Sequence, residues 1–410
     1  MTRLLTIYKL WCLPALLSLL AACSANDDDG TPVADGTAVV NFEATMAQAN
    51  DQTTRAANQV NELATMQDAA YPGFGVFACY TGLHGYSDSN VHPDFMYNER
   101  VRWDGTTSLW AYSPLKYWPN GEGEATGNTG SNPHFVSFMA YAPWSDGESD
   151  NPAGYCIPSF SLQGEIGNPW LTYRLHESVA NQVDLLYAPS QLDQRKPAAD
   201  YRIPFEFKHA LACVGDKVNI ICSDAIKSQL DSRVRGSSIT NAMVVVTGIQ
   251  IEYTLTSKAR LVLWNQGEAN WQTIWSENPT CTRTVSILDP DDDADNETVY
   301  AYNTSIPTTI NTKNSWTGNG VFYIPIELSG YAQTAKVSVT HCIATYSGSS
   351  WKYDVEKTGT ATVNLHDYSD AYKSGKHLFI NVTLNQVDIA LTAAIAPWDV
   401  ITQEVEGIED

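Results

Sequence analysis

Apolar and polar residues alternate one by one in many short stretches of this chain, which is the period of a β-strand and not of an α-helix. Residues 38–46 are the clearest early case, because the residues on one side of the stretch are all apolar: Val40, Phe42, Ala44 and Met46. Residues 249–256 repeat the pattern later in the chain. Such alternation is typical of strands in an antiparallel sheet that buries one face and exposes the other.

Strands are expected wherever short apolar or alternating runs lie between turn residues. We predict them at residues 74–80, 100–103, 109–112, 135–141, 203–211, 218–221, 261–264, 321–328, 336–343, 362–365, 378–384 and 387–393. Helical periodicity is almost absent, and the apolar residues Val60, Leu63 and Met66 indicate at most a short helix. Many short strands joined by Gly, Asn and Ser turns favour an all-β fold of antiparallel sandwiches.

A polar stretch near the middle of the chain predicts a domain boundary. Residues 191–200 contain Arg195-Lys196-Pro197 and separate two strand-rich regions. Domain boundaries fall in polar, Pro-containing segments that few contacts cross. We therefore expect one sandwich over residues 38–198 and a second over residues 199–410.

The N-terminus predicts export. A short basic start and a brief apolar run lead to Leu20-Ala21-Ala22-Cys23, which resembles a bacterial lipobox. Residues 1–22 would then be a lipoprotein signal peptide, Cys23 the lipidated cysteine, and residues 23–37 an acidic tether. Two alternatives are an ordinary signal peptide, with Cys23 incidental, and a retained membrane anchor. The anchor is disfavoured because a span needs about 20 apolar residues.

The composition describes a globular, acidic protein. Of the 410 residues, 43% are hydrophobic and 17% charged, and the formal net charge is −22. That charge argues against binding to nucleic acid or to an anionic membrane surface. Attachment to a membrane would therefore have to come from a lipid and not from basic residues.

The cysteines and acidic residues show no local metal-binding motif. Besides Cys12 and Cys23 the chain has six cysteines, with no CxxC or Cys/His spacing, so no structural zinc is expected. Cys213 and Cys222 are the one plausible local disulfide pair. The acidic run at 289–297 does not meet the EF-hand ligand spacing and is interpreted as a solvated loop. We therefore predict no metal and no cofactor.

Catalytic motifs are not found either. The sequence contains no GxSxG, HExxH or phosphate-loop pattern. His209 lies on an apolar strand and is interpreted as a structural histidine with a partner, because no nucleophile pattern accompanies it. A glycosidase pair of carboxylates is neither supported nor excluded. The chain is therefore not expected to be an enzyme.

Several short motifs occur in a characteristic order. They are the lipobox, the strand at 38–46, Thr54-Arg55-Ala56, the Gly-Val-Phe-Ala of 75–78, the Tyr-Trp-Pro of 117–119, residues 136–143, 184–188 and 207–211, and an apolar hairpin with Trp398. In this order they resemble the fimbrillin family of the Bacteroidetes, the lipoprotein pilins and accessory subunits of fimbriae.

The resemblance implies a fold and a way of assembly. It implies two tandem transthyretin-like β-sandwiches, a surface-exposed outer-membrane lipoprotein, and cleavage by an arginine-specific protease between Arg55 and Ala56. Residues 38–55 would then be a cleavable first strand, and the strand at 38–46 would be replaced by a strand from another subunit. The implied partners are other fimbrial subunits, the outer membrane through the lipid, and a host or bacterial surface ligand.

A different function is compatible with the same chain. Tryptophan and tyrosine are abundant, with 12 and 21 residues, and such side chains contact carbohydrate. The alternative is a non-polymerising surface lipoprotein that binds glycans in a shallow cleft lined by Trp103, Trp110 or Trp271.

Overall fold

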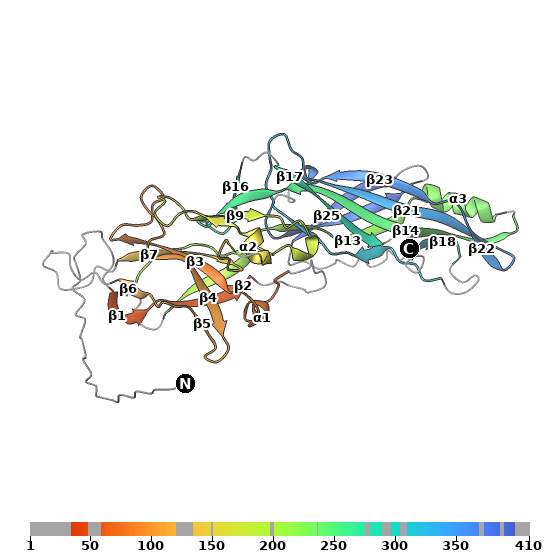
Figure 1. Ribbon diagram of the computed structural model, residues 1–410. Helices are drawn as coiled ribbons and strands as arrows, with labels where there is room; N and C mark the ends of the chain where they lie inside the picture. The colour runs from red at the N-terminus through yellow and green to blue at the C-terminus, as the bar shows by residue number, and fades with distance from the viewer. Residues whose placement is uncertain are drawn as a thin grey trace, which may run out of the picture.

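The computed structural model describes residues 34–47, 59–119, 134–148, 151–196, 201–235, 237–274, 279–288, 297–303, 310–368, 373–385 and 389–397. Regular structure within these ranges is mostly β-strand, arranged in an elongated molecule (Figure 1). The all-β class predicted from the alternating pattern is confirmed.

The N-terminal part is built on one strongly curved sheet. In spatial order its strands are β2 (Asn41–Met46), β12 (Arg202–His209), β10 (Leu186–Tyr187), β7 (Phe135–Ala142), β3 (Phe74–Gly82), β4 (Met96–Asp104) and β5 (Leu109–Ala111), with β11 (Gln191–Gln194) also paired to β7. A short ribbon of β1 (Ala34–Val39) and β6 (Tyr117–Pro119) lies next to it. The curvature brings β2 and β5, the two ends of this order, beside each other.

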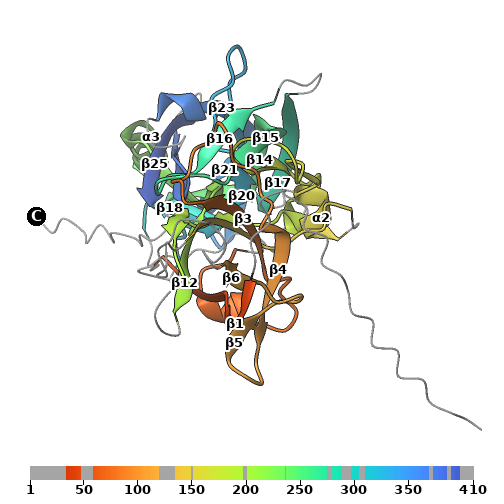
Figure 2. The same ribbon diagram turned by 90° about the vertical axis from the view of Figure 1, so that its left-hand side faces the viewer.

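The end-on view makes this curvature visible. In Figure 2, β12 and β4 lie on opposite sides, and β1, β5 and β6 lie below and between them. The apolar faces of the strands point into the enclosed space and form a core that includes Val40, Phe74, Phe138 and Phe205. The first strands of the chain therefore complete the wall of this core.

The C-terminal part consists of two sheets packed face to face. One contains β19 (Ser315–Thr317), β13 (Ala212–Cys222), β24 (Lys376–Leu384) and β25 (Ile389–Pro397), with β20 (Val321–Tyr323) on β13. The other contains β17 (Thr280–Leu288), β14 (Ile239–Thr256), β21 (Thr334–Ser347) and β22 (Ser350–Tyr353), with β18 (Glu297–Ala301) and β23 (Lys357–Asn364). Side chains such as Val218, Ile251 and Val337 are fully buried between them.

A further sheet joins the two parts. Its strands are β16 (Asn270–Thr273), β15 (Lys258–Val262), β9 (Trp170–Arg174) and β8 (Ser159–Phe160). Leu261 is the register partner of Leu171, so a strand from the second half of the chain pairs with one from the first. Leu261 and Leu171 belong to one apolar cluster with Phe77 of β3 and Ile380 of β24, so this core extends across both parts.

Strand pairing does not follow the predicted boundary between residues 198 and 199. β12 begins at Arg202, yet it pairs with β2 and β10 of the N-terminal sheet. The chain enters the C-terminal sheets only after Ala210 and Leu211, where β13 begins directly. Within the polar stretch, Gln191–Gln194 form β11, which pairs with β7 of the N-terminal sheet. Independent folding of the two halves stays a prediction.

Two pairings differ from the expected antiparallel arrangement. β2 runs parallel to β12, and β13 runs parallel to β24. Parallel neighbours require a long crossover connection, and in each case more than 140 residues lie between the two strands. Alternation within one strand carries no information about the direction of its neighbour, so this feature was not predictable from the pattern.

Helices are short in the described residues. They are α1 (Leu63–Met66), α2 (Pro152–Cys156), α3 (Asp224–Val234) and the 3-10 turns η1 (Val179–Asn181) and η3 (Leu365–Asp367). α1 confirms the short helix expected near Val60. α3 was missed, although the Ser223 side chain caps it by accepting from the Ile226 N–H, and Ile226 and Leu230 bury one face.

Candidate assembly site

The first predicted strand forms as its sequence pattern indicates. In β2 and just before it, Val40, Phe42 and Ala44 are 0%, 2% and 3% exposed, whereas their polar neighbours face solvent. Met46 is half-buried at the end of the strand. Burial of side chains as large as valine or phenylalanine contributes about 1.5–3 kcal/mol each. β2 is therefore held mainly by its apolar face.

Phe42 lies at the centre of an aromatic cluster. Its ring stacks on Phe205 of β12, with centroids 5.7 Å apart and planes inclined by 21°. Three further rings surround it at centroid distances of 5.5 Å, 6.0 Å and 6.3 Å: Tyr112, Phe138 and Phe74. Without β2, these rings would line an apolar groove.

The hydrogen bonds of β2 come mainly from one side. Its backbone pairs with β12 from Asn41 opposite Arg202 to Met46 opposite Phe207, and this is its only strand partner in the described part of the chain. On the other side the Tyr112 hydroxyl donates to the Val40 carbonyl at 2.7 Å. β2 is thus an edge strand, and its absence would expose the edge of β12. The peptide that ends at Arg55 also contains β1, which pairs with β6.

The chain after this strand is anchored at a separate place. The Val60 N–H donates to Asp184 Oδ2 at 2.9 Å, and the same carboxylate contacts His209 Nδ1 at 3.0 Å. Gln59 Nε2 lies 3.4 Å from His377 Nε2. These contacts hold the segment that begins at Gln59 independently of β2. They also confirm that His209 is a buried histidine with a partner.

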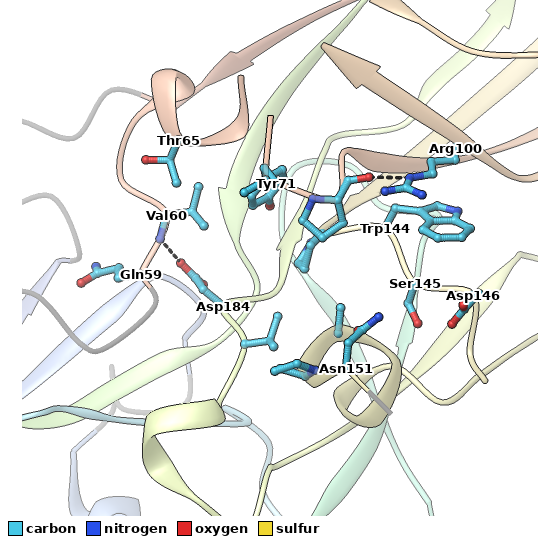
Figure 3. Close-up of a pocket in the computed structure, with 16 residues that line it drawn as sticks. Gln59, Val60, Thr65, Tyr71, Arg100, Trp144, Ser145, Asp146, Asn151 and Asp184 are labelled. Carbon is cyan, nitrogen blue, oxygen red and sulfur yellow. Dashed lines mark hydrogen bonds between the residues drawn. The ribbon is translucent and has the colours of Figure 1, made fainter. Parts of the chain in front are cut away.

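A cavity of about 670 Å³ lies beside this anchor. Figure 3 shows Val60 and Asp184 at one side of it, and Arg100 and Trp144 at the other. The Arg100 guanidinium donates from Nε to the Pro72 carbonyl at 2.7 Å and lies over the Trp144 ring, 4.5 Å from its centroid. The volume is in the range of small-ligand sites, about 300–1,000 Å³.

The tryptophans predicted to line a glycan cleft do not line the cavity described above. Trp110 is buried, and Trp103 packs on it with ring centroids 5.4 Å apart. Trp271 packs against the apolar cluster that contains Leu261 and Ile380, and its indole N–H donates to the Ala210 carbonyl at 2.9 Å. The cavity described above is lined instead by Trp144 and Tyr71, which the sequence pattern did not single out.

Several predicted residues lie outside the described residues. They are the signal peptide of residues 1–22, Cys23, most of the acidic tether, Arg55, Ala56, Trp398 and the acidic run up to residue 296. Lipidation at Cys23 and cleavage between Arg55 and Ala56 therefore stay predictions. In the ranges that the structure describes, no helix is both long and apolar enough to cross a bilayer.

The six described cysteines are free thiols. Cys213 and Cys222, the one plausible local pair, are not bonded, because both residues belong to β13 and lie nine positions apart along it. An extended strand rises about 3.3 Å per residue, so their separation far exceeds the reach of a disulfide. Cys79 and Cys342 are buried, as expected for small apolar core residues.

Fold and edge strand together define a class: an all-β protein in which the edge strand β2 closes the N-terminal core. No protein-family model matches the chain. It is 23% identical over 370 residues to the fimbrium subunit Fim1C of Phocaeicola vulgatus, covering 85% of this chain and 87% of that protein.

A solved structure has the same fold. The crystal structure of a fimbrial protein from Bacteroides vulgatus aligns with a TM-score of 0.56 and 17% sequence identity, over 88% of this chain and 99% of that one. The predicted resemblance to the fimbrillin family of the Bacteroidetes is confirmed by these relatives. Both relatives are fimbrial proteins by name, and the solved structure shows that this chain shares their fold.

Proposed function

We propose that this protein is a structural and adhesive subunit of a cell-surface fimbria that is exported as a lipoprotein and assembled by proteolysis and strand exchange. Cys23 would carry the lipid in the outer membrane, and a protease would cut between Arg55 and Ala56. Release of residues up to Arg55 would remove β1 and β2 together, and with them the pairs β1–β6 and β2–β12. A strand from a neighbouring subunit would then fill the groove and bond to the exposed edge of β12.

One observation carries this proposal: β2 is buried through its apolar face but is bonded to a single strand, at an end of the sheet order. A strand in that position can be replaced by another strand without breaking the pairing of the strands beyond β12. Separate anchoring of Val60 on Asp184 supports the same conclusion, because the new N-terminal segment would stay in place after the cut. Backbone bonds would supply affinity and the pockets of Val40, Phe42 and Ala44 would set the register.

The test is native digestion with an arginine-specific protease. We expect cleavage after Arg55, loss of the peptide that contains β2, and growth of oligomers with protein concentration, followed by light scattering and intact mass. Arg55→Ala should abolish all three, and Arg195→Ala is the matched control at another arginine. A cut chain that stays monomeric and retains the peptide would contradict assembly by strand exchange.

Glycan binding is the second candidate function. The observation that favours it is the cavity lined by Tyr71, Arg100 and Trp144, since aromatic rings beside a guanidinium suit the faces and hydroxyls of a sugar. Isothermal titration with soluble oligosaccharides tests it. Binding that Trp144→Ala abolishes and Trp271→Ala preserves would support a glycan site in this cavity.

A further inference from the structure

Three side chains with metal-binding atoms meet in the core of the C-terminal part. Cys213 and Asp216 belong to β13, and His377 belongs to the neighbouring strand β24. Their ligand atoms all lie within 4.8 Å of one another, and the residues are 0%, 0% and 1% exposed. Cys213 and His377 are direct register partners across the parallel pair. The strand pairing therefore builds the cluster.

An irregularity in β13 brings Asp216 into the cluster with Cys213 and His377. Between Val214 and Val218 the register shifts, because the facing residues of β24, Leu378 and Ile380, are only two positions apart. Gly215 allows this bulge with a φ of +76°, a conformation that residues with a side chain rarely adopt. The bulge places Asp216 on the buried side, beside Cys213.

A second glycine leaves room around the cluster. A Cβ atom on Gly320 would lie 2.5 Å from Cys213 Sγ and 2.7 Å from the Cβ of Asp216. Any larger residue at this position would therefore displace the two potential ligands. The backbone at Gly320 therefore packs directly against Cys213 and Asp216.

The Asp216 carboxylate is incompletely satisfied. Its Oδ2 lies 2.7 Å from His377 Nδ1, but its Oδ1 is buried without a hydrogen-bond partner among the described residues. A second buried His–Asp pair among the described residues offers a comparison, because Asp184 contacts His209 and also accepts the Val60 N–H. A buried carboxylate oxygen without a partner is costly, so a cation beside Asp216 would remove a penalty that Asp184 does not have.

We propose that Cys213, Asp216 and His377 form a binding site for a thiophilic divalent metal ion, with zinc as the best fit. A thiolate, a carboxylate and a neutral imidazole are ligands that zinc prefers, and their charges balance that of the ion. Calcium and magnesium require several oxygen ligands, which the cluster does not offer.

The geometry is close to what zinc requires. Zinc bonds of about 2.0–2.3 Å place tetrahedral ligand atoms about 3.3–3.8 Å apart. The cluster spans at most 4.8 Å, so movements of about one ångström would close it around an ion. Zinc binds the thiolate form of cysteine, so binding at Cys213 would release the thiol proton.

The position of the site indicates a structural role. The three side chains are at most 1% exposed, so an ion held between these core strands would be shielded from solvent and substrate and would act structurally. His377 also lies next to Gln59, at 3.4 Å, on the segment that follows the proposed cleavage site. An ion bound here would fix β13, β24 and that segment together.

The test uses the purified full-length protein, refolded after treatment with a chelator and titrated with Zn²⁺ or Co²⁺. We expect about one metal ion per chain, a thiolate-to-cobalt charge-transfer band in the near ultraviolet, and a higher Tm with metal. Cys213→Ser should abolish the band, and His377→Gln should weaken zinc binding more than about 100-fold, the upper range for loss of an outer-shell partner.

Two further variants make the result decisive. Cys222→Ser removes another buried thiol of the same strand and should leave both the band and the affinity unchanged. Asp216→Asn keeps the size of the side chain and should lower zinc affinity while the circular dichroism spectrum remains native. The proposal is overturned if the refolded protein binds no stoichiometric metal, or if the cobalt band persists in Cys213→Ser.

Discussion

The ring of Phe42 lies stacked on that of Phe205, with centroids 5.7 Å apart, although 162 positions separate the two residues in the chain. Because β2 is bonded to a single strand, contacts of this kind hold it in the uncut protein. The first strand therefore depends on side-chain packing more than on its backbone bonds.

Phe42→Ala should destabilise the uncut protein by about 3–5 kcal/mol, the usual cost of removing a buried phenylalanine side chain. Urea unfolding followed by circular dichroism measures this change. Glu43→Ala, on the solvent side of the same strand, is the control and should change the free energy of unfolding by less than about 0.5 kcal/mol. Equal effects of the two substitutions would mean that β2 does not contribute its apolar face to the core.

An N-terminal fragment should fold only if it contains strand β12. A fragment that ends at residue 198 lacks β12, so it leaves β2 without its strand partner and exposes Phe74 and Phe138. A fragment that ends at Leu211 retains β12. We expect a cooperative thermal transition for the longer fragment and none for the shorter one. Identical transitions would show that β12 is dispensable for the N-terminal core.

Cys23→Ala should move the protein from the membrane to the soluble fraction. Each acyl CH₂ buried in the bilayer contributes about 0.8 kcal/mol, so the loss of the chains removes the anchor. Membrane fractionation and labelling with a radioactive fatty acid measure the result. Cys12→Ala, inside the predicted signal peptide, is the matched control and should retain both label and membrane attachment. Unchanged partition of Cys23→Ala would exclude lipidation at this residue.

Thiol reagents should distinguish Cys281 from the other described cysteines. Cys281 is half-buried, whereas the others are buried. Burial, as the largest cause, raises the pKa of Cys156 and Cys342 to about 11 and that of Cys222 to about 12. The thiolate is the reacting form, so these groups should react slowly near pH 8.

The measurement is labelling of a Cys23→Ser variant with a maleimide, located by peptide mass spectrometry. Cys281 should be modified first in the native protein, and all six described cysteines should react in denaturant. An additional Cys281→Ser substitution should remove the fast phase. Fast native labelling at Cys156 or Cys222 would indicate that the core opens more readily than its burial implies.

The sequence by itself determined the class of the fold and the location of many strands. Alternation over residues 38–46 predicted which face of β2 is buried, because side chains in an extended chain point to opposite sides in turn. The lipobox and the order of short motifs pointed to the fimbrillins, which the comparisons confirmed. These are local features, so a single sequence is sufficient to recognise them.

Only the tertiary structure decided which distant strands become neighbours. The parallel pairs of β2 with β12 and of β13 with β24 join segments more than 140 residues apart, and no periodicity encodes such a choice. For the same reason the cluster of Cys213, Asp216 and His377 was not recognised from the sequence. The lack of a local ligand spacing led to the prediction of no metal. Side chains that lie on two different strands and on a bulge have no fixed spacing in the sequence. Their atoms come together only when the chain folds.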